Sequence, residues 1–286
     1  MSDRFAADWL SLREPFDAAA RDAALAQRFI AALPRRPWLI DLGAGTGSLF
    51  RDLAPRIGGE QHWTLIDADA ALLEEGFNVI AAWAVARGYE LDPGADTLAI
   101  HTPSGVWRID GELHDLADMP GQLPLAAADA VVCSALLDLV SRPWLDALAG
   151  ALRQPFYATL TADGRDVWRP AHALDRRLRA FFRRDQGRDK GFGPALGPHA
   201  VAAAEAAFAA RGFAVATAAS DWVMDADALA MAHALIGALG EVALRWEPRQ
   251  ASAIAAWDRL RHRQAMRGRL AIRIGHRDIL ALPPAE

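Results

Sequence analysis

The chain has 286 residues, of which 52% are apolar and 23% charged, and its formal net charge is −5. This composition is typical of a globular protein with a buried core and excludes a disordered or fibrous chain. A negative protein exerts no long-range attraction on nucleic acid, so the composition disfavours a nucleic-acid partner.

Cysteine and hydropathy patterns predict the cellular setting. The single cysteine, Cys133, cannot form an internal disulfide, and no Cys/His cluster has the spacing of a metal site. No signal-peptide core begins the sequence, and no apolar run has the length that a bilayer requires. We therefore expect a cytoplasmic protein without a metal or a membrane segment.

Segments of helical periodicity alternate with short apolar runs along most of the chain, which predicts a parallel sheet with helices on both faces. Strands are expected at 38–42, 61–66, 97–102, 106–114, 129–134, 155–160, 212–218 and 270–274. Helices are expected at 4–33 with a break at Pro15, and at 48–56, 70–87, 144–152, 200–210, 226–246 and 250–266.

Three segments depart from simple alternation. Residues 1–34 form N-terminal helices, and the polar segment 161–199 resembles a lid because it ends in a run rich in glycine and proline. Residues 224–267 form a helical insert before the last strand. Since no linker separates these segments, we expect residues 1–286 to form a single domain.

A glycine-rich run follows the first predicted strand. Gly43, Gly45 and Gly47 occupy its first, third and fifth positions, and Asp41 lies two residues before Gly43. Such a turn lets the backbone approach a ligand closely at the start of a helix. A dinucleotide fingerprint requires glycine at the sixth position, where this chain has Ser48.

A second acid ends the next predicted strand. Asp67 lies 24 residues after Gly43, where a carboxylate with two oxygens can accept hydrogen bonds from both ribose hydroxyls. The alternative role, the N-cap of the following helix, already has a candidate in Asp69.

A third feature extends the pattern from Glu112 to Ser134, with Asp115 after one strand and Asp129 beginning the next. Together the three features resemble the class I S-adenosylmethionine-dependent methyltransferase family over roughly residues 36–160. By this resemblance Asp115 and Leu116 flank adenine, Leu72 gives an apolar adenine contact, and residues 133–135 pass beneath the methionine part; an ordinary solvated loop acid is the alternative for Asp115. The cofactor contacts implied are Asp41, Gly43, Ala44, Gly45, Gly47, Asp67, Ala68, Leu72, Asp115, Leu116 and Ser134.

The resemblance implies a Rossmann-like, seven-stranded, mostly parallel sheet with helices on both faces. It also implies that S-adenosylmethionine is the cofactor and that a nucleophile on an acceptor displaces the sulfonium methyl group in line. Asp138 follows the strand that holds Cys133, and it is the candidate general base; a helix cap or a solvated acid is the alternative.

Candidate acceptor contacts come from the lid-like segment, where residues 165–190 hold nine basic residues and four acids. Arginines there could clamp a carboxylate or phosphate, although a solvated amphipathic helix at 173–184 explains them as well. Arg13 or Arg21 could lie near the carboxylate of the cofactor. The substrate-binding candidates are His172, Arg184, Lys190 and His199.

The sequence leaves several functions open. We expect a methyltransferase for a small, polar or anionic molecule, and a homodimer is possible. The arginine-rich segments 165–190 and 245–277 keep a methyltransferase of RNA or protein as an alternative. A nicotinamide-dependent dehydrogenase and a non-catalytic cofactor-binding protein are further alternatives.

Overall fold

The computed structural model describes residues 7–94, 97–118, 123 and 125–284, which form ten strands and nine helices. The helices are α1 (Ala7–Ala20), α2 (Ala23–Ala31), α3 (Ser48–Ile57), α4 (Ala70–Ala86), α5 (Arg142–Ala151), α6 (Asp175–Gln186), α7 (Ala200–Ala209), α8 (Leu229–Trp246) and α9 (Ala251–Met266). The strands are β1 (Trp38–Leu42), β2 (Gln61–Asp67), β3 (Glu90–Pro93), β4 (Thr97–Thr102), β5 (Gly105–Leu113), β6 (Ala130–Ser134), β7 (Phe156–Arg169), β8 (Ala214–Ala219), β9 (Trp222–Met224) and β10 (Ala271–Leu282).

All ten strands belong to one sheet with the order β3-β4-β5-β2-β1-β6-β7-β10-β8, and β9 pairs with β10. The strands β5, β2, β1, β6 and β7 pair in parallel, whereas β10 is antiparallel to both β7 and β8. The central strands therefore end along one carboxyl edge, where α/β proteins of this kind bind ligands.

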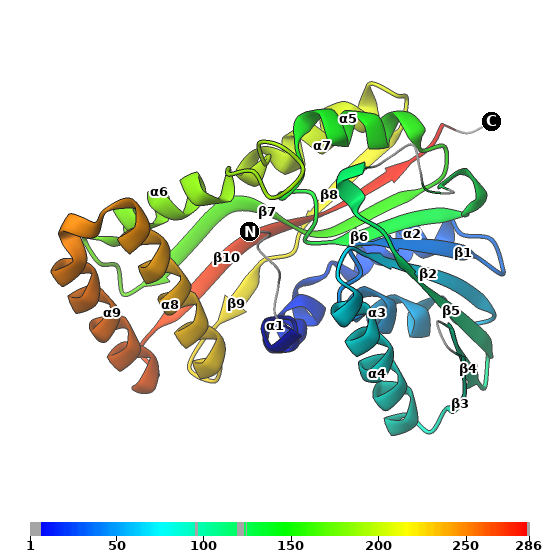
Figure 1. Ribbon diagram of the computed structural model, residues 1–286, viewed down its shortest axis with the longest axis horizontal. Helices are drawn as coiled ribbons and strands as arrows, with labels where there is room; N and C mark the ends of the chain where they lie inside the picture. The colour runs from blue at the N-terminus through cyan, green and yellow to red at the C-terminus, as the bar shows by residue number, and fades with distance from the viewer. Residues whose placement is uncertain (1–6, 95–96, 119–122, 124, 285–286) are drawn as a thin grey trace.

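Alternate side chains of the central strands pack into two hydrophobic cores, one on each face of the sheet. Ile40 and Leu42 face α5 and α7, and Leu39 faces α2, α3 and α4. Figure 1 shows the two helical layers on opposite sides of the sheet. The mixed α/β class with a mostly parallel sheet, predicted from the alternation of elements, is confirmed, although the described residues form ten strands rather than seven.

Three predicted boundaries are wrong for identifiable reasons. The last strand, expected at 270–274, continues to Leu282, because its added residues pair with β7 and β8. The N-terminal helices break at Arg21 and Asp22, not at Pro15, because the Asp22 carboxylate caps α2 by accepting the Leu25 amide at 2.7 Å. The strand expected to end at Leu160 continues to Arg169, because its added residues pair with β10. Nine residues of the lid-like segment are therefore strand. Residues 1–6 of the predicted N-terminal helices lie outside the described residues.

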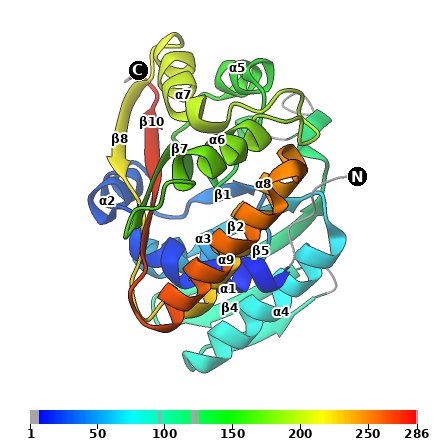
Figure 2. The ribbon, with the colours of Figure 1, turned by 90° about the vertical axis from the view of Figure 1, so that its left-hand side faces the viewer.

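The helical insert and the strand extensions build a cap with a core of its own. Trp168 of β7, Trp222 of β9 and Met231 of α8 are buried together with apolar residues of α1, α6 and α9. Figures 1 and 2 show α6, α8 and α9 gathered over the extended ends of β7 and β10. By length and composition alone α8 could cross a membrane, against the expectation from the sequence, but Ile236, Leu239 and Ala243 lie within this third core.

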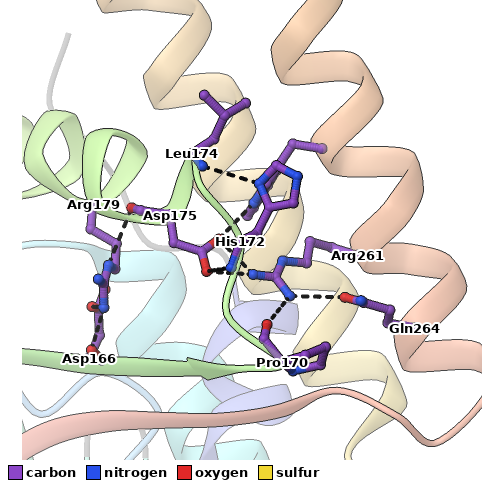
Figure 3. A network of polar contacts seen from close by, with 9 residues as sticks. Asp166, Pro170, His172, Leu174, Asp175, Arg179, Arg261 and Gln264 are labelled. Atoms are coloured by element: carbon purple, nitrogen blue, oxygen red, sulfur yellow. Dashed lines mark hydrogen bonds and ion pairs between the residues drawn. The ribbon is translucent and has the colours of Figure 1, made fainter.

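A buried ion pair fastens α9 to the start of α6 (Figure 3). Arg261, whose side chain is fully buried, donates to both carboxylate oxygens of Asp175 at 2.6 and 2.5 Å. It also donates to the Pro170 carbonyl at 2.7 Å, and the Trp257 indole donates to Asp175 at 2.9 Å. These hydrogen bonds hold the pKa of Asp175 below its usual value despite burial, which raises it. Removing one partner of such a pair costs about 3–5 kcal/mol.

Close packing of α4 positions the glycine turn that follows β1. A Cβ atom on Gly47 would lie 2.6 Å from the Ile80 Cδ1 of α4, and one on Gly76 would lie 3.0 Å from the Gly45 carbonyl oxygen. Gly47 and Gly76 therefore let the helix and the turn approach each other.

We predict that Gly76→Ala destabilises the protein by about 1–3 kcal/mol, because the added methyl group presses on the backbone of the turn. Alanine otherwise stabilises a helix interior relative to glycine by about 1 kcal/mol. Gly237→Ala in α8 is the matched control, since no described atom lies within 4 Å of its added Cβ. Urea unfolding measures both variants, and equal stabilisation of the two would contradict the packing argument.

Candidate functional site

The glycine turn at the carboxyl end of β1 is held in place by β2. Gly43, Gly45 and Gly47 have φ angles of 68°, 54° and 75°, which residues other than glycine rarely adopt. The Gly43 and Ala44 amides donate to the Ile66 carbonyl at 2.8 and 2.9 Å. The turn is therefore fixed before any ligand binds.

Asp67 completes this arrangement from the end of β2. Its Oδ2 accepts the Gly45 amide at 2.8 Å, and its Oδ1 accepts the Asp69 amide at 3.0 Å. Burial raises the pKa of Asp67, while these hydrogen bonds oppose the rise. The Ala68 amide is a third donor to this carboxylate, which has about four acceptor positions, so Asp67 keeps the capacity to accept a hydroxyl of a ligand. Asp69 caps α4 by accepting the Ala71 amide at 3.0 Å, as predicted.

Asp41 and Arg21 bring a buried acid and a buried cation to the turn. Among the described residues, neither carboxylate oxygen of Asp41 has a hydrogen-bond partner, and both are buried. Burial raises the pKa of Asp41 to about 8, although the nearby Arg21 guanidinium opposes this rise. Arg21, at the end of α1, donates through Nη2 to the Ser48 and Ser134 hydroxyls at 3.3 and 3.4 Å.

The Arg21 guanidinium has N–H donors that it does not use within the fold. Its Nε and Nη1 are buried and make no hydrogen bond within the described part of the chain, although Nη1 lies 3.8 Å from an oxygen of Asp52. A buried acid without a hydrogen-bond partner, next to a buried guanidinium with unused donors, suits a ligand with an amino-acid zwitterion. The sequence offered Arg13 or Arg21 for this role; Arg13 instead pairs with Asp17 at 2.9 Å.

An apolar wall lies on the other side of Gly43. The Leu136 and Leu116 Cδ1 atoms lie 3.6 and 3.9 Å from the Cβ position of Gly43. Trp144 fixes Leu116 by donating to its carbonyl at 2.6 Å. Leu136 was missed because an isolated leucine after a strand has no distinctive sequence signal.

The remaining predicted cofactor contacts have varied positions. Ser134 ends β6 and accepts the Thr159 hydroxyl at 3.0 Å, and Leu72 is buried in the first turn of α4. Asp115 caps a short turn by accepting the Ala117 amide at 2.9 Å, and Ala68 is exposed.

Asp138 lies in the loop after β6 and contacts β7. The Asp138 carboxylate accepts the Ala162 amide, and its buried Oδ1 has no hydrogen-bond partner among the described residues. Burial raises the pKa of Asp138 to about 6. Ala162 pairs with His276 in the sheet. Burial, together with the nearby Arg13 charge, lowers the pKa of His276 to about 4, so its imidazole is neutral. The sequence analysis missed His276, whose place opposite Ala162 follows from strand pairing.

The predicted substrate contacts are divided between the cap and its border. His172 lies before α6, where its Nδ1 accepts the Leu174 amide at 3.1 Å, and Arg184 stacks on Trp246 at 4.1 Å. Lys190 and the exposed His199 bracket a segment that borders the Asp138 loop, because the Gly197 amide donates to the Asp138 carbonyl at 2.9 Å. Substrate contact stays a prediction for all four.

The sequence matches no family model and no curated relative. Solved structures similar to this chain include three enzymes. A SAM-dependent methyltransferase from Thiobacillus denitrificans in complex with S-adenosyl-L-homocysteine is 15% identical, covering 98% of this chain and 100% of that one, with a TM-score of 0.45.

The second is geranyl diphosphate C-methyltransferase from Streptomyces coelicolor A3(2), 11% identical over 99% of this chain and 88% of that one, with a TM-score of 0.45. The third is a cyclopropane synthase from Mycobacterium tuberculosis, 11% identical over 97% and 94% of the two chains, with a TM-score of 0.47. Because these TM-scores are below 0.5, the assignment of the site rests on its own geometry.

We predict that Asp41→Asn stabilises the ligand-free protein at pH 8. The pKa of Asp41 is about 8 in the folded state and ordinarily 3.8, so between these pH values the folded state holds a proton that the unfolded state releases. Stability therefore falls as the pH rises through this window, and asparagine removes the fall. The free energy of unfolding of the variant minus that of wild type should increase by more than about 1 kcal/mol between pH 5 and pH 8, which corresponds to roughly 2 °C in Tm.

Thermal unfolding across this pH range measures the effect. Asp146→Asn, which alters an exposed ion pair with Arg142, is the control and should show no such growth. A difference between wild type and Asp41→Asn that does not depend on pH would contradict the prediction.

Proposed function

We propose that this chain is a class I S-adenosylmethionine-dependent methyltransferase that modifies a small, polar or anionic molecule in the cytoplasm. The proposal rests on one observation: three sets of residues, each suited to a different part of S-adenosylmethionine, lie at one glycine turn. Asp67 can accept a ribose hydroxyl, Arg21 and Asp41 suit an amino-acid zwitterion, and Leu116 with Leu136 offers a wall for adenine. S-adenosylmethionine contains all three groups.

The hydrogen bonds of the turn disfavour a nicotinamide dinucleotide at the same place. A dinucleotide places its diphosphate against the backbone amides at the start of the helix after the turn. Here the Gly45 amide already donates to Asp67 at 2.8 Å. The sixth position of the glycine pattern is Ser48, which accepts a hydrogen bond from Arg21.

Each group in this site has a separate proposed task. S-adenosylmethionine supplies a methyl group already activated on a sulfonium, so the chain itself mainly orients the reactants and excludes water. Leu10 of α1 lies 3.1 Å from the Cβ position of Gly45 and so covers the turn. The Glu14 carboxylate of α1 pairs with Arg51, which also donates to the Thr46 carbonyl. These contacts fasten α1 over the site.

Binding of S-adenosylhomocysteine tests the cofactor site. We expect calorimetry to give a Kd near or below the micromolar range, and no binding of NADH. Asp67→Asn should weaken binding about tenfold or more, because it loses a charged hydrogen-bond acceptor, and exposed Glu74→Gln on α4 is the control.

A comparison of two ligands tests the role of Arg21. Arg21→Met should weaken S-adenosylhomocysteine but leave 5′-methylthioadenosine unchanged, since the latter lacks the amino-acid group. Asp67→Asn should weaken both ligands. No binding of S-adenosylhomocysteine at millimolar concentration would end this proposal.

Asp138 is the proposed general base for an acceptor hydroxyl. Above its pKa of about 6 the carboxylate is ionised, and its buried Oδ1 can take the proton that leaves the acceptor oxygen. This task rests on the position of Asp138 in the loop that follows β6.

Transfer of a labelled methyl group to a panel of small alcohols, phenols, amines and carboxylates identifies the acceptor. With a hydroxyl acceptor, kcat/KM should fall tenfold per pH unit below about pH 6. Asp138→Asn should lower kcat by about 10²–10⁴-fold and leave the Kd of S-adenosylhomocysteine unchanged. An unaltered pH profile in Asp138→Asn would assign the base elsewhere, and activity confined to RNA or protein would overturn the small-molecule proposal.

A further inference from the structure

We propose that a hollow on the cap binds a small phosphate-bearing molecule, at a site separate from the glycine turn. The hollow has a volume of about 460 Å³, within the range of small-ligand sites. Four arginines from three elements line it, with aspartates, glycines and a valine: Gly164, Arg165, Asp166, Val167, Arg179, Arg183, Asp221, Arg273 and Gly275.

Glycines shape the floor of this hollow. A Cβ on Gly164 would lie 2.6 Å from Pro198, and one on Gly275 would overlap Asp163 and Arg165. The strands β7 and β10 therefore need glycine at these points for their neighbours to close in, and the backbone there presents no side chain to the hollow.

The carboxylates point inward and the guanidinium groups face solvent. Arg165 and Arg273 donate to Asp221 at 2.7 and 2.6 Å, and the His276 amide donates to the same carboxylate at 3.2 Å. The Asp221 side chain is only 3% exposed, whereas those of Arg165 and Arg273 are 52% and 59% exposed. The surface offered to a ligand is thus cationic in a protein whose net charge is −5.

These ion pairs leave hydrogen-bond donors available. Arg273 uses Nε for Asp221, and Arg179 uses Nη1 for Asp166 and Nε for the Asp175 carbonyl. The Arg183 guanidinium makes no hydrogen bond within the described part of the chain, although its charge acts on the nearby Asp166. A guanidinium group has five N–H donors, so unused donors from α6 and β10 line one hollow.

Phosphate is the anion that fits this set of donors best. Arginine binds phosphate oxygens with two parallel hydrogen bonds, and groups already oriented by carboxylates lose little freedom on binding. Val167, which is 44% exposed, gives an apolar contact for the organic part of a phosphate ester. The site does not depend on the proposed methyltransferase function, because none of its lining residues belongs to the glycine turn.

Calorimetry with inorganic phosphate, at ionic strength held constant with sodium chloride, tests the site. Wild-type protein should bind phosphate in the millimolar range or tighter, and at least tenfold more tightly than succinate. Arg273→Gln and Arg183→Gln should each weaken phosphate at least tenfold. Arg177→Gln is the matched control, because this α6 arginine pairs with Glu247 and does not line the hollow.

The outcomes separate this site from the glycine turn. Both hollow variants should bind S-adenosylhomocysteine as wild type does, so failure of that ligand to bind wild type would concern only the proposed function. No phosphate binding at 10 mM, equal binding of succinate, or phosphate binding that survives both substitutions would overturn the phosphate site.

Discussion

The antiparallel pairing of β7 with β10 is the interaction on which both the central sheet and the cap depend. It runs from Phe156 and Ala281 at the edge of the central sheet to Arg169 and Ala271 in the cap. Within the sheet it joins β8 to the parallel strands, and beyond the carboxyl edge it carries β9 and the floor for α6, α8 and α9. The same ladder brings His276 to Ala162, which Asp138 contacts, and Gly275 to the cap hollow. One pairing thus positions residues beside the Asp138 loop and in the cap hollow.

The glycine turn shows how a binding site can oppose stability. Burying Asp41 without a hydrogen-bond partner raises its pKa to about 8, and burying Arg21 leaves guanidinium donors unused. Both features are unfavourable in the ligand-free protein, since an unpaired buried polar group costs about 1–3 kcal/mol. A zwitterionic ligand would satisfy both at once. The cap pair of Asp175 and Arg261 is the opposite case, because its hydrogen bonds are made within the fold.

Sequence reasoning succeeded where the signal was local. The positions of β1, the turn, β2 and the Asp69 cap all follow from neighbouring residues, because glycine conformation and helix capping act over a few residues. It failed at β9, at the extension of β7 and at the break after α1. Strand extension depends on a distant partner, which no local pattern specifies.

The sequence by itself determined the α/β class and the acids and glycines of the turn, since strand periodicity and φ preferences are properties of short segments. Only the tertiary structure decided that Arg21 rather than Arg13 lies beside Asp41, that Leu136 lies against the turn, and that Asp138 contacts the Ala162 amide of β7. It alone gathered arginines of β7, α6 and β10 around one hollow. These groups come from segments far apart in the chain, and their meeting depends on which strands pair and which helices pack, which no local pattern specifies.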